Sequence, residues 1–247
     1  MIKFFRKIRY DLMEKGKTSK YLKYAIGEIV LVMIGILLAI QANNWNINRT
    51  AKTELNQSLN KLLIELNQDT ETLNREIEEN TIMISALDSC LIILKEPEKY
   101  TFEKFEKLFI YSNYTNSFEF TRVTFDALSN SGKLKQIKNS ILSDSLINYY
   151  GNSGFKQVES ALVFHVRNNF RSYALGFDYL NTANEFDTYN PSDFDITRKT
   201  LNDYRSDIRI INTIRVKIVL HRFLNENYKD IIPRTEYLIK TIKQELE

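Results

Sequence analysis

Residues 25–42 read AIGEIVLVMIGILLAIQA, and this stretch decides how the chain is built. Tyr21 and Tyr24 stand before it and Trp45 stands after it. Aromatic side chains gather in this way at the two interfaces of a membrane. As a helix, the segment from Tyr24 to Trp45 would span about 32 Å, which matches the hydrocarbon core of a bilayer. We therefore expect a transmembrane helix over 24–45.

The charge on either side of this segment predicts its orientation. Residues 1–24 contain eight Lys or Arg and two acidic residues, for a net charge of +6. By the positive-inside rule we expect a basic cytoplasmic tail over 1–23 and an extracytoplasmic domain over 46–247, periplasmic if the anchor lies in the inner (cytoplasmic) membrane of a Gram-negative cell. The alternative is a cleaved signal peptide with Ile40 and Ala42 at its cleavage site. Secretory signals usually carry a shorter basic region, which favours the uncleaved anchor.

Four residues of the anchor fall near one helix face: Glu28, Gly35, Ala39 and Ala42. Small residues let two helix backbones approach closely, and a carboxylate in such a seam marks a helix–helix contact. This interpretation predicts a homo-oligomer or a membrane protein partner. The simpler interpretation is that Glu28 reaches toward the lipid headgroups about one turn away.

Two stretches resemble a known family. MIKFFRKIR at 1–9, with KYLKYAIGEIVLVMIGILLAIQANNWN at 20–46, is similar to the opening of an uncharacterised family of single-pass membrane proteins of Bacteroidetes. FDALSNSGKLKQIKNSILSDSLINYY at 125–150 resembles the middle of the same family. The resemblance implies a helical C-terminal domain and a location in the bacterial envelope. It brings no activity with it.

Beyond the anchor, apolar residues recur in steps of three and four, as on one face of a helix. The first stripe comprises Leu55, Leu59, Leu62, Leu66, Leu73, Ile77, Ile84, Leu87, Leu91 and Leu94. Asp69 and Asn80 are polar interruptions that could fix the register or break the helix, and Pro97 should end it. A stripe this narrow suits packing within a bundle, although a homotypic coiled coil is an alternative.

A second stripe runs from Ile208 to Leu246, and Pro233 should kink it or break it in two. Its part between Ile208 and Leu224 has apolar residues on more than one face, which predicts the most buried helix of the domain. Packing the two stripes antiparallel, with shorter helices beside them, is the simplest arrangement. The fold class expected is all-α: one N-terminal transmembrane helix followed by an elongated antiparallel helical bundle.

The region between the stripes predicts short helices. Thr101 is placed to cap one of them, and Glu103 and Lys107 have the spacing of an ion pair on its surface. Gly132 is a suitable helix stop. Apolar spacing from Phe155 to Tyr173 predicts a helix of about six turns.

The segment 177–195, FDYLNTANEFDTYNPSDFD, has five acidic residues, five aromatic residues and no Lys or Arg. It is either a surface loop or a recognition loop for a cationic or carbohydrate ligand. The candidate recognition residues are Asp178, Tyr179, Asp187, Tyr189, Asp193 and Asp195. A calcium site is poorly supported, since the spaced carboxylates and glycine of an EF-hand loop are missing.

The sequence has no GxSxG, HExxH, GxxxxGK[ST] or GxGxxG motif. The sequence has two histidines, His165 and His221, and one cysteine, Cys90, which we expect to be buried. These residues are too few for a metal site, and a single cysteine cannot form a disulfide within the chain. We also expect no cofactor. The carboxylates fall on what periodicity predicts to be outer helix faces, and we therefore expect no enzymatic activity. Beyond the anchor the net charge is −2, which argues against nucleic acid as a partner.

Two functions remain. In the first, the domain is a structural, scaffolding or protein-interaction module of the envelope, with membrane lipid around its anchor. In the second, it is a periplasmic sensor-like domain that binds a ligand and acts through a separate membrane partner, because the short tail holds no signalling domain.

Overall fold

The computed structural model of the chain describes residue 10 and residues 18–170 and 199–247. Within these residues the fold is all-α, as the sequence predicts, and contains no strand. The chain divides into two compact units, Met1–Gln57 and Ser58–Glu247. One helix, α2 (Thr18–Lys95), contributes to both.

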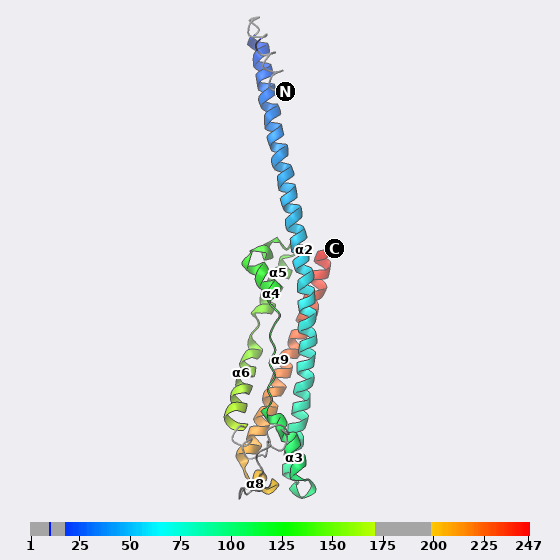
Figure 1. The fold of residues 1–247 in the computed structure, drawn as a ribbon, viewed down its shortest axis with the longest axis vertical. Helices are drawn as coiled ribbons and strands as arrows, with labels where there is room; N and C mark the ends of the chain where they lie inside the picture. Colours follow the sequence, from blue (N-terminus) through cyan, green and yellow to red (C-terminus); the bar gives the residue numbers. More distant parts are fainter. Residues whose placement is uncertain (1–9, 11–17, 171–198) are drawn as a thin grey trace, which may run out of the picture. The chain divides into compact units, whose positions relative to one another are not determined.

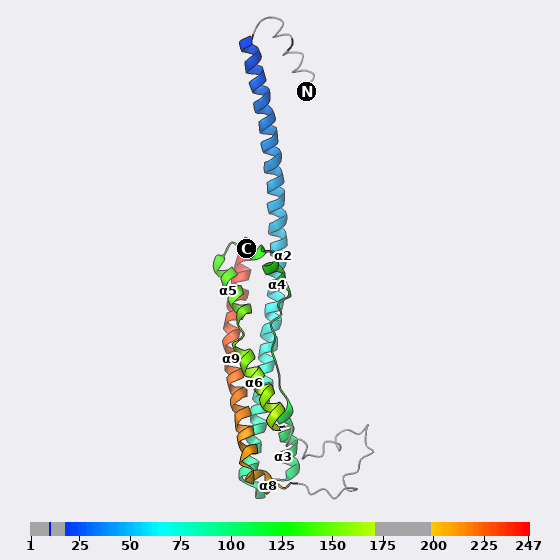
Figure 2. The ribbon, with the colours of Figure 1, turned by 90° about the vertical axis from the view of Figure 1, so that its left-hand side faces the viewer.

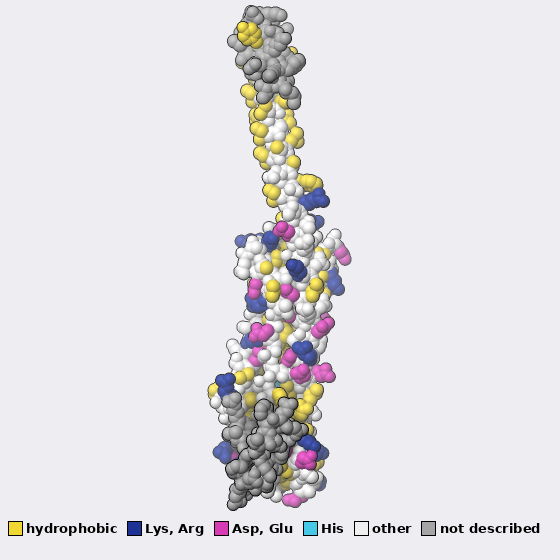
Figure 3. Space-filling view, in the orientation of Figure 1, with side chains coloured by type: hydrophobic (Ala, Val, Ile, Leu, Met, Phe, Trp, Pro, Cys, Tyr) yellow, Lys and Arg dark blue, Asp and Glu magenta, His cyan; other side chains and the backbone are white. Residues whose placement is uncertain are grey.

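In the first unit, α2 includes the apolar stretch that the sequence marks as an anchor. Among the described residues, α2 is the helix long and apolar enough to cross a membrane, and the most apolar window of its sequence is not buried by any other part of the protein. Hydrophobic side chains cover the visible face of this stretch, with no charged side chain among them (Figure 3). Tyr24 and Trp45, at its two borders, are both exposed.

The second unit is organised around the last part of α2 and around α9 (Ile208–Leu246), which lie side by side and antiparallel (Figures 1 and 2). In this unit one row of buried residues on α2 follows a strict alternation of steps of three and four. The row consists of Leu59, Leu62, Leu66, Asp69, Leu73, Glu76, Asn80, Met83, Leu87, Cys90 and Leu94, and Glu65, Ala86 and Ile93 are buried beside it. This spacing is the 3.5-residue repeat of a coiled-coil seam.

One row of buried residues on α9 shows the same alternation, with Thr213, Ile218, Asn225 and Thr241 buried beside it. Its seam consists of Ile210, Ile214, Lys217, His221, Leu224, Tyr228, Ile231, Thr235, Leu238 and Ile242. Each seam therefore contains polar residues at positions that normally hold aliphatic ones. Asn80 of α2 meets Asn225 and His221 of α9, which fixes the register of the two helices.

Shorter elements pack around this pair. In chain order they are η1 (Pro97–Lys99), α3 (Phe102–Phe109), η2 (Ile110–Asn113), α4 (Val123–Asn130), η3 (Lys133–Gln136), α5 (Ser140–Gly151), α6 (Gly154–His165), η4 (Val166–Phe170, a π-helical turn) and α8 (Leu201–Ser206). The helices α5 and α6 both contact α9.

Local sequence signals account for several of these boundaries. The Thr101 hydroxyl accepts a hydrogen bond from the amide of Lys104 at 3.3 Å, which caps α3 as expected. Gly132 adopts φ +71°, a conformation that other residues rarely take, and stops α4. Thr200 and Asp203 form a capping box at the start of α8.

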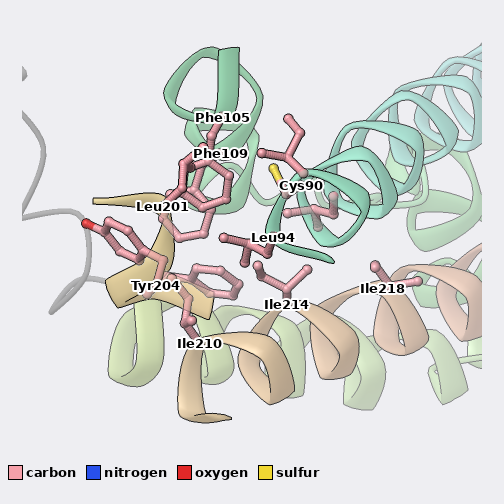
Figure 4. Close-up of a cluster of buried hydrophobic side chains, with 12 residues drawn as sticks. Cys90, Leu94, Phe105, Phe109, Leu201, Tyr204, Ile210, Ile214 and Ile218 are labelled. Atoms are coloured by element: carbon pink, nitrogen blue, oxygen red, sulfur yellow. The ribbon is translucent and has the colours of Figure 1, made fainter. Parts of the chain in front are cut away.

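The end of the unit where α2 stops is closed by a cluster of apolar side chains (Figure 4). Phe105 and Phe109 of α3 stack at 5.2 Å between ring centroids, and Tyr204 of α8 lies 5.4 Å from Phe105. Cys90 lies inside this cluster and is fully buried, as predicted. Burial raises the pKa of its thiol to about 12, so the thiol stays protonated.

The two prolines of the long stripes behave differently. Helix α2 ends at Lys95, just before Pro97, as predicted. The helix α9 continues through Pro233, so of the two expected outcomes, a kink or a break, the break does not occur. In the first half of α9, Val216, Val219 and Phe223 are about half exposed, so not every apolar side chain of this half is covered by the described part of the domain.

Candidate functional site

The most unusual element of the second unit is an extended segment, residues 114–122, which we call the strap. It connects η2 to α4, and its residues belong to no helix. In Figures 1 and 2 it runs lengthwise beside α2 and α9. A backbone placed inside a bundle in this way needs partners for its amide and carbonyl groups.

Buried carboxylates accept hydrogen bonds from the amides of the strap. The Phe118 amide donates to Glu159 Oε1 at 2.8 Å, and the Thr121 amide donates to Asp69 Oδ1 at 2.9 Å. Just after the strap, the amide of Thr124 donates to Glu65 Oε1 at 3.1 Å, so a side chain of α2 caps the start of α4. Carboxylates from α2 and α6 thus replace the neighbouring strand that an extended segment usually has.

Two lysines donate hydrogen bonds to carbonyl groups in the strap and in η2 just before it. The fully buried Lys217 ammonium donates to the carbonyl oxygens of Tyr111 and Ser112 in η2 and of Tyr114 in the strap, at 3.0, 2.6 and 2.7 Å. Lys156 Nζ donates to the carbonyl of Phe118. Burial lowers the pKa of Lys217 to about 7.

Aromatic rings fill the space around the middle of the strap. Phe118 is fully buried and lies 5.6 Å from Phe155 and 5.9 Å from Tyr228. Phe120 packs 4.7 Å from the ring of Tyr149. The Tyr228 hydroxyl donates to Glu159 at 2.5 Å, so the same carboxylate holds both the strap and α9.

A second polar group joins the two long helices directly. Asn80 Nδ2 donates to Asn225 Oδ1 at 2.9 Å, and His221 Nδ1 lies 2.9 Å from Asn80 Oδ1. An amide oxygen only accepts, so the proton of the His221 ring is on Nδ1. Burial, with a smaller effect from the charge of Lys217, lowers the pKa of His221 to about 3, which keeps the ring neutral.

Asp69 and Glu159 are hydrogen-bonded within the protein, whereas Glu76 Oε2 and His221 Nε2 have no hydrogen-bond partner in the described part of the chain. Burial raises the pKa of Asp69 although the Thr121 amide opposes the shift. Glu76 also has a raised pKa, first from burial and then from the charge of Glu79. In the described part of the chain, no three His, Cys, Asp or Glu side chains lie close enough together to hold a metal ion.

The outer side of α9 has a different character. Its first half, residues 208–224, has no acidic residue and four Lys or Arg, of which Arg209, Arg215 and Arg222 are exposed and Lys217 is buried in the seam. The side chains of Val216, Val219 and Phe223 are exposed there, with Arg215 and Arg222 beside them on the helix. We call residues 208–224 on this side the basic face.

A hollow of about 390 Å³ adjoins the basic face at the junction of α2, α8 and α9. Leu91, Leu94 and Ile211 supply apolar walls to it. The remaining lining residues are all cations, namely Lys95, Arg205 and Arg215. The arrangement attracts a group that carries both an aliphatic part and negative charge.

Most of the residues singled out from the sequence lie apart from these features. Gly35, Ala39 and Ala42 are exposed on α2 in the first unit, and Glu28 is half-buried there. No other part of the described chain lies within 4 Å of the position that a side chain at Gly35 would take. The candidate recognition loop, 177–195, lies outside the described residues. The possible helix–helix contact stays a prediction.

The sequence interpretation that places the carboxylates on outer helix faces is wrong for three of them. Glu65, Glu76 and Glu159 are at most 9% exposed. Asp69, which the sequence places within the apolar stripe, is buried there. The signal was present, because Asp69, Glu76 and Asn80 continue the four-and-three spacing of the leucines. The sequence interpretation takes Ile77 as the seam residue, whereas the structure buries Glu76, so the expected seam lies one residue away from the observed one at this point.

Comparison with known proteins gives a family without a function. A family model described as "Family of unknown function (DUF6090)" matches residues 28–195. The matched range includes the apolar stretch of α2 and the strap, and it ends before α8 and α9. No curated protein and no solved structure matches the chain.

Proposed function

The chain belongs to the DUF6090 family, whose function is unknown, and we propose that this member is a membrane-anchored protein-interaction module. The apolar part of α2 is the anchor, surrounded by membrane lipid. The observation that carries the proposal is the basic face of α9, where three large apolar side chains are about half exposed between cations. Such a stripe on a surface helix is typical of a docking surface for another helix.

Charge indicates the chemistry of the partner. Arg215 has no carboxylate partner within the described residues, and Arg222 pairs only with Asp88, at 3.2 Å, across an exposed surface. The neighbouring hollow adds Lys95 and Arg205. The partner is therefore an acidic amphipathic segment of another protein, whose apolar side chains cover Val219 and Phe223 and whose carboxylates pair with the cations.

The buried charges support an interaction module over an enzyme. The Lys217 ammonium is bonded to three backbone carbonyls, and Glu159 and Asp69 each accept a backbone amide of the strap. Groups bound in this way are committed to the fold. The proposal assigns no reaction and no cofactor to the domain.

The proposed topology places the basic tail in the cytoplasm and the second unit in the periplasm, with the anchor in the inner membrane. It rests on the +6 charge of residues 1–24. Since Cys90 is fully buried, a cysteine at the exposed position of Glu226 can be labelled selectively. A membrane-impermeant maleimide should label Glu226→Cys in spheroplasts. Labelling only after lysis would contradict this orientation.

A photo-cross-linking side chain at Val219, introduced into the full chain in its native host, tests the partner. We expect one adduct whose partner peptide has more acidic than basic residues. Charge reversal by Arg215→Glu should reduce the adduct severalfold, while the same cross-linker at exposed Asp230, in the second half of α9, should not form it.

Three results would count against the proposal. One is an adduct that Arg215→Glu leaves unchanged. The second is a partner peptide without excess acidic residues, and the third is an adduct between two copies of this chain.

A further inference from the structure

A separate hollow, of about 330 Å³, opens between α5 and the second half of α9. Helix α5 contributes Asn148 and Tyr149, and α9 contributes Pro233, Arg234 and Tyr237. Its volume is at the lower end of what small-molecule sites have. It lies on a different part of α9 from the basic face, so what binds there is independent of the proposed protein partner.

The inner wall of this hollow is held in place by the network of the strap. Tyr149 is 3% exposed, and its hydroxyl lies 3.4 Å from Asp69 Oδ2 of α2 and 3.1 Å from Thr235 Oγ1 of α9. These two contacts fix the position of Tyr149, which lines the hollow. Leu238, which is 1% exposed, completes an apolar floor. The floor is therefore formed before any ligand arrives.

The mouth of the hollow has one cation and no carboxylate among its lining residues. Arg234 is exposed, and it makes no ion pair with any residue that the structure describes. This holds even for Asp230, which stands one helical turn earlier at the spacing where ion pairs usually form. The guanidinium is thus available to an anion in the hollow, and the Asn148 amide offers a neutral donor beside it.

We propose that this hollow binds a small organic carboxylate with an aromatic body. Arg234 pairs with the carboxylate, for which a guanidinium has matching bidentate geometry. The rings of Tyr149 and Tyr237 and the side chain of Leu238 hold the body, since aromatic rings pack favourably against one another. The ligand touches Tyr149, whose hydroxyl joins the two long helices, and this gives the sensor-like alternative function a defined site.

The test uses the full chain in lipid nanodiscs, with phenylacetate as the probe and phenylacetamide as its neutral counterpart. Saturation-transfer NMR with empty nanodiscs as the blank measures the binding of each. We expect phenylacetate to bind at least about tenfold more tightly than the amide, and Arg234→Gln to weaken phenylacetate by about tenfold, or about 1.4 kcal/mol. The matched control, Lys229→Gln, removes an exposed cation of the same helix and should leave binding unchanged.

Three results would overturn the proposal. The first is the absence of saturation transfer to phenylacetate. The second is equal binding of acid and amide, which would mean that charge is not recognised. The third is an equal effect of the Arg234 and Lys229 substitutions, which would mean that binding occurs elsewhere.

Discussion

Replacing Glu159 separates two ways in which a buried carboxylate can stabilise this domain. Glu159 accepts the Phe118 amide at 2.8 Å and the Tyr228 hydroxyl at 2.5 Å, and it pairs with Lys156 at 3.1 Å. Glu119 pairs with the same lysine at 2.9 Å but is exposed and touches no buried donor. The two acids therefore share the ion pair and differ in whether they hold the strap.

The magnitude follows from the groups left without a partner. Glu159→Ala leaves two buried donors unsatisfied, each at a cost of about 1–3 kcal/mol, so we expect the free energy of unfolding to fall by about 4 kcal/mol. Glu159→Gln keeps an oxygen for both donors and loses only the charge, for about 1–2 kcal/mol. Glu119→Ala removes an exposed ion pair and should cost less than about 1 kcal/mol.

Urea unfolding of the full chain in a mild detergent measures these differences, followed by far-UV circular dichroism. Near-UV circular dichroism reports the aromatic residues around the strap in the same samples. Equal losses for Glu159→Ala and Glu119→Ala would refute the reasoning, because they would assign the stabilisation to the Lys156 ion pair and not to the strap amide.

Three further predictions concern the other buried polar groups. Glu65→Ala removes the acceptor of the Thr124 amide and hydroxyl and should lower the free energy of unfolding by about 2 kcal/mol, whereas Glu78→Ala on the exposed side of α2 should change it little in the same urea titration. Asn80→Ala leaves His221 Nδ1–H and Asn225 Oδ1 without partners and should lower the free energy of unfolding by about 2 kcal/mol. The control, Asn74→Ala at an exposed position of α2, should change it very little. Similar losses for both variants would refute a register-fixing role of Asn80. The pKa of Lys217 is about 7 in the folded chain and 10.5 ordinarily. Above pH 7 the folded chain therefore binds fewer protons than the unfolded chain. The free energy of unfolding should rise between pH 7 and pH 9, by at most about 1.4 kcal/mol per pH unit. Lys217→Met should remove this rise and Lys229→Met should keep it, when unfolding is followed as a function of pH; a rise that survives in Lys217→Met would have another origin.

Much of the helical framework can be predicted from the sequence, because its signals are local. The stop before Pro97, the Thr101 cap and the left-handed Gly132 each depend on a few neighbouring residues. The two long apolar stripes are likewise visible as spacing. The antiparallel pairing of α2 with α9 follows from the length of the stripes and the need to bury both.

The position of the seam on α2 is harder to predict. A straight helix repeats every 3.6 residues, whereas a seam between two helices repeats every 3.5 residues. Because of this difference, the seam expected from one repeat moves to a neighbouring residue of the other repeat after several turns. Reading Ile77, Ile84 and Leu91 as the seam keeps every residue apolar. The structure instead buries Glu76, Met83 and Cys90, and Glu76 Oε2 has no hydrogen-bond partner in the described part of the chain.

The strap could not be predicted at all, since residues 114–122 have no periodicity and their partners are remote in sequence. Phe118 is 41 residues from Glu159, and Tyr114 is 103 residues from Lys217. The hollow beside Pro233 likewise depends on how closely α5 approaches α9. Pro233 was recognisable as a special position, but a proline alone does not indicate whether a helix breaks or continues around it.

Amide hydrogen exchange along the strap tests most directly the claim that the buried charges of this domain are bound to its own backbone. The measurement uses the full chain in nanodiscs and resolves the amides of Phe118 and Thr121. We predict that both are protected as strongly as amides in the core of α9, near Leu224, although neither belongs to a helix. We also predict that Glu159→Ala abolishes the protection of Phe118 while Glu119→Ala preserves it. Exchange of both amides as fast as at exposed Ser153, which lies between α5 and α6, would contradict the account.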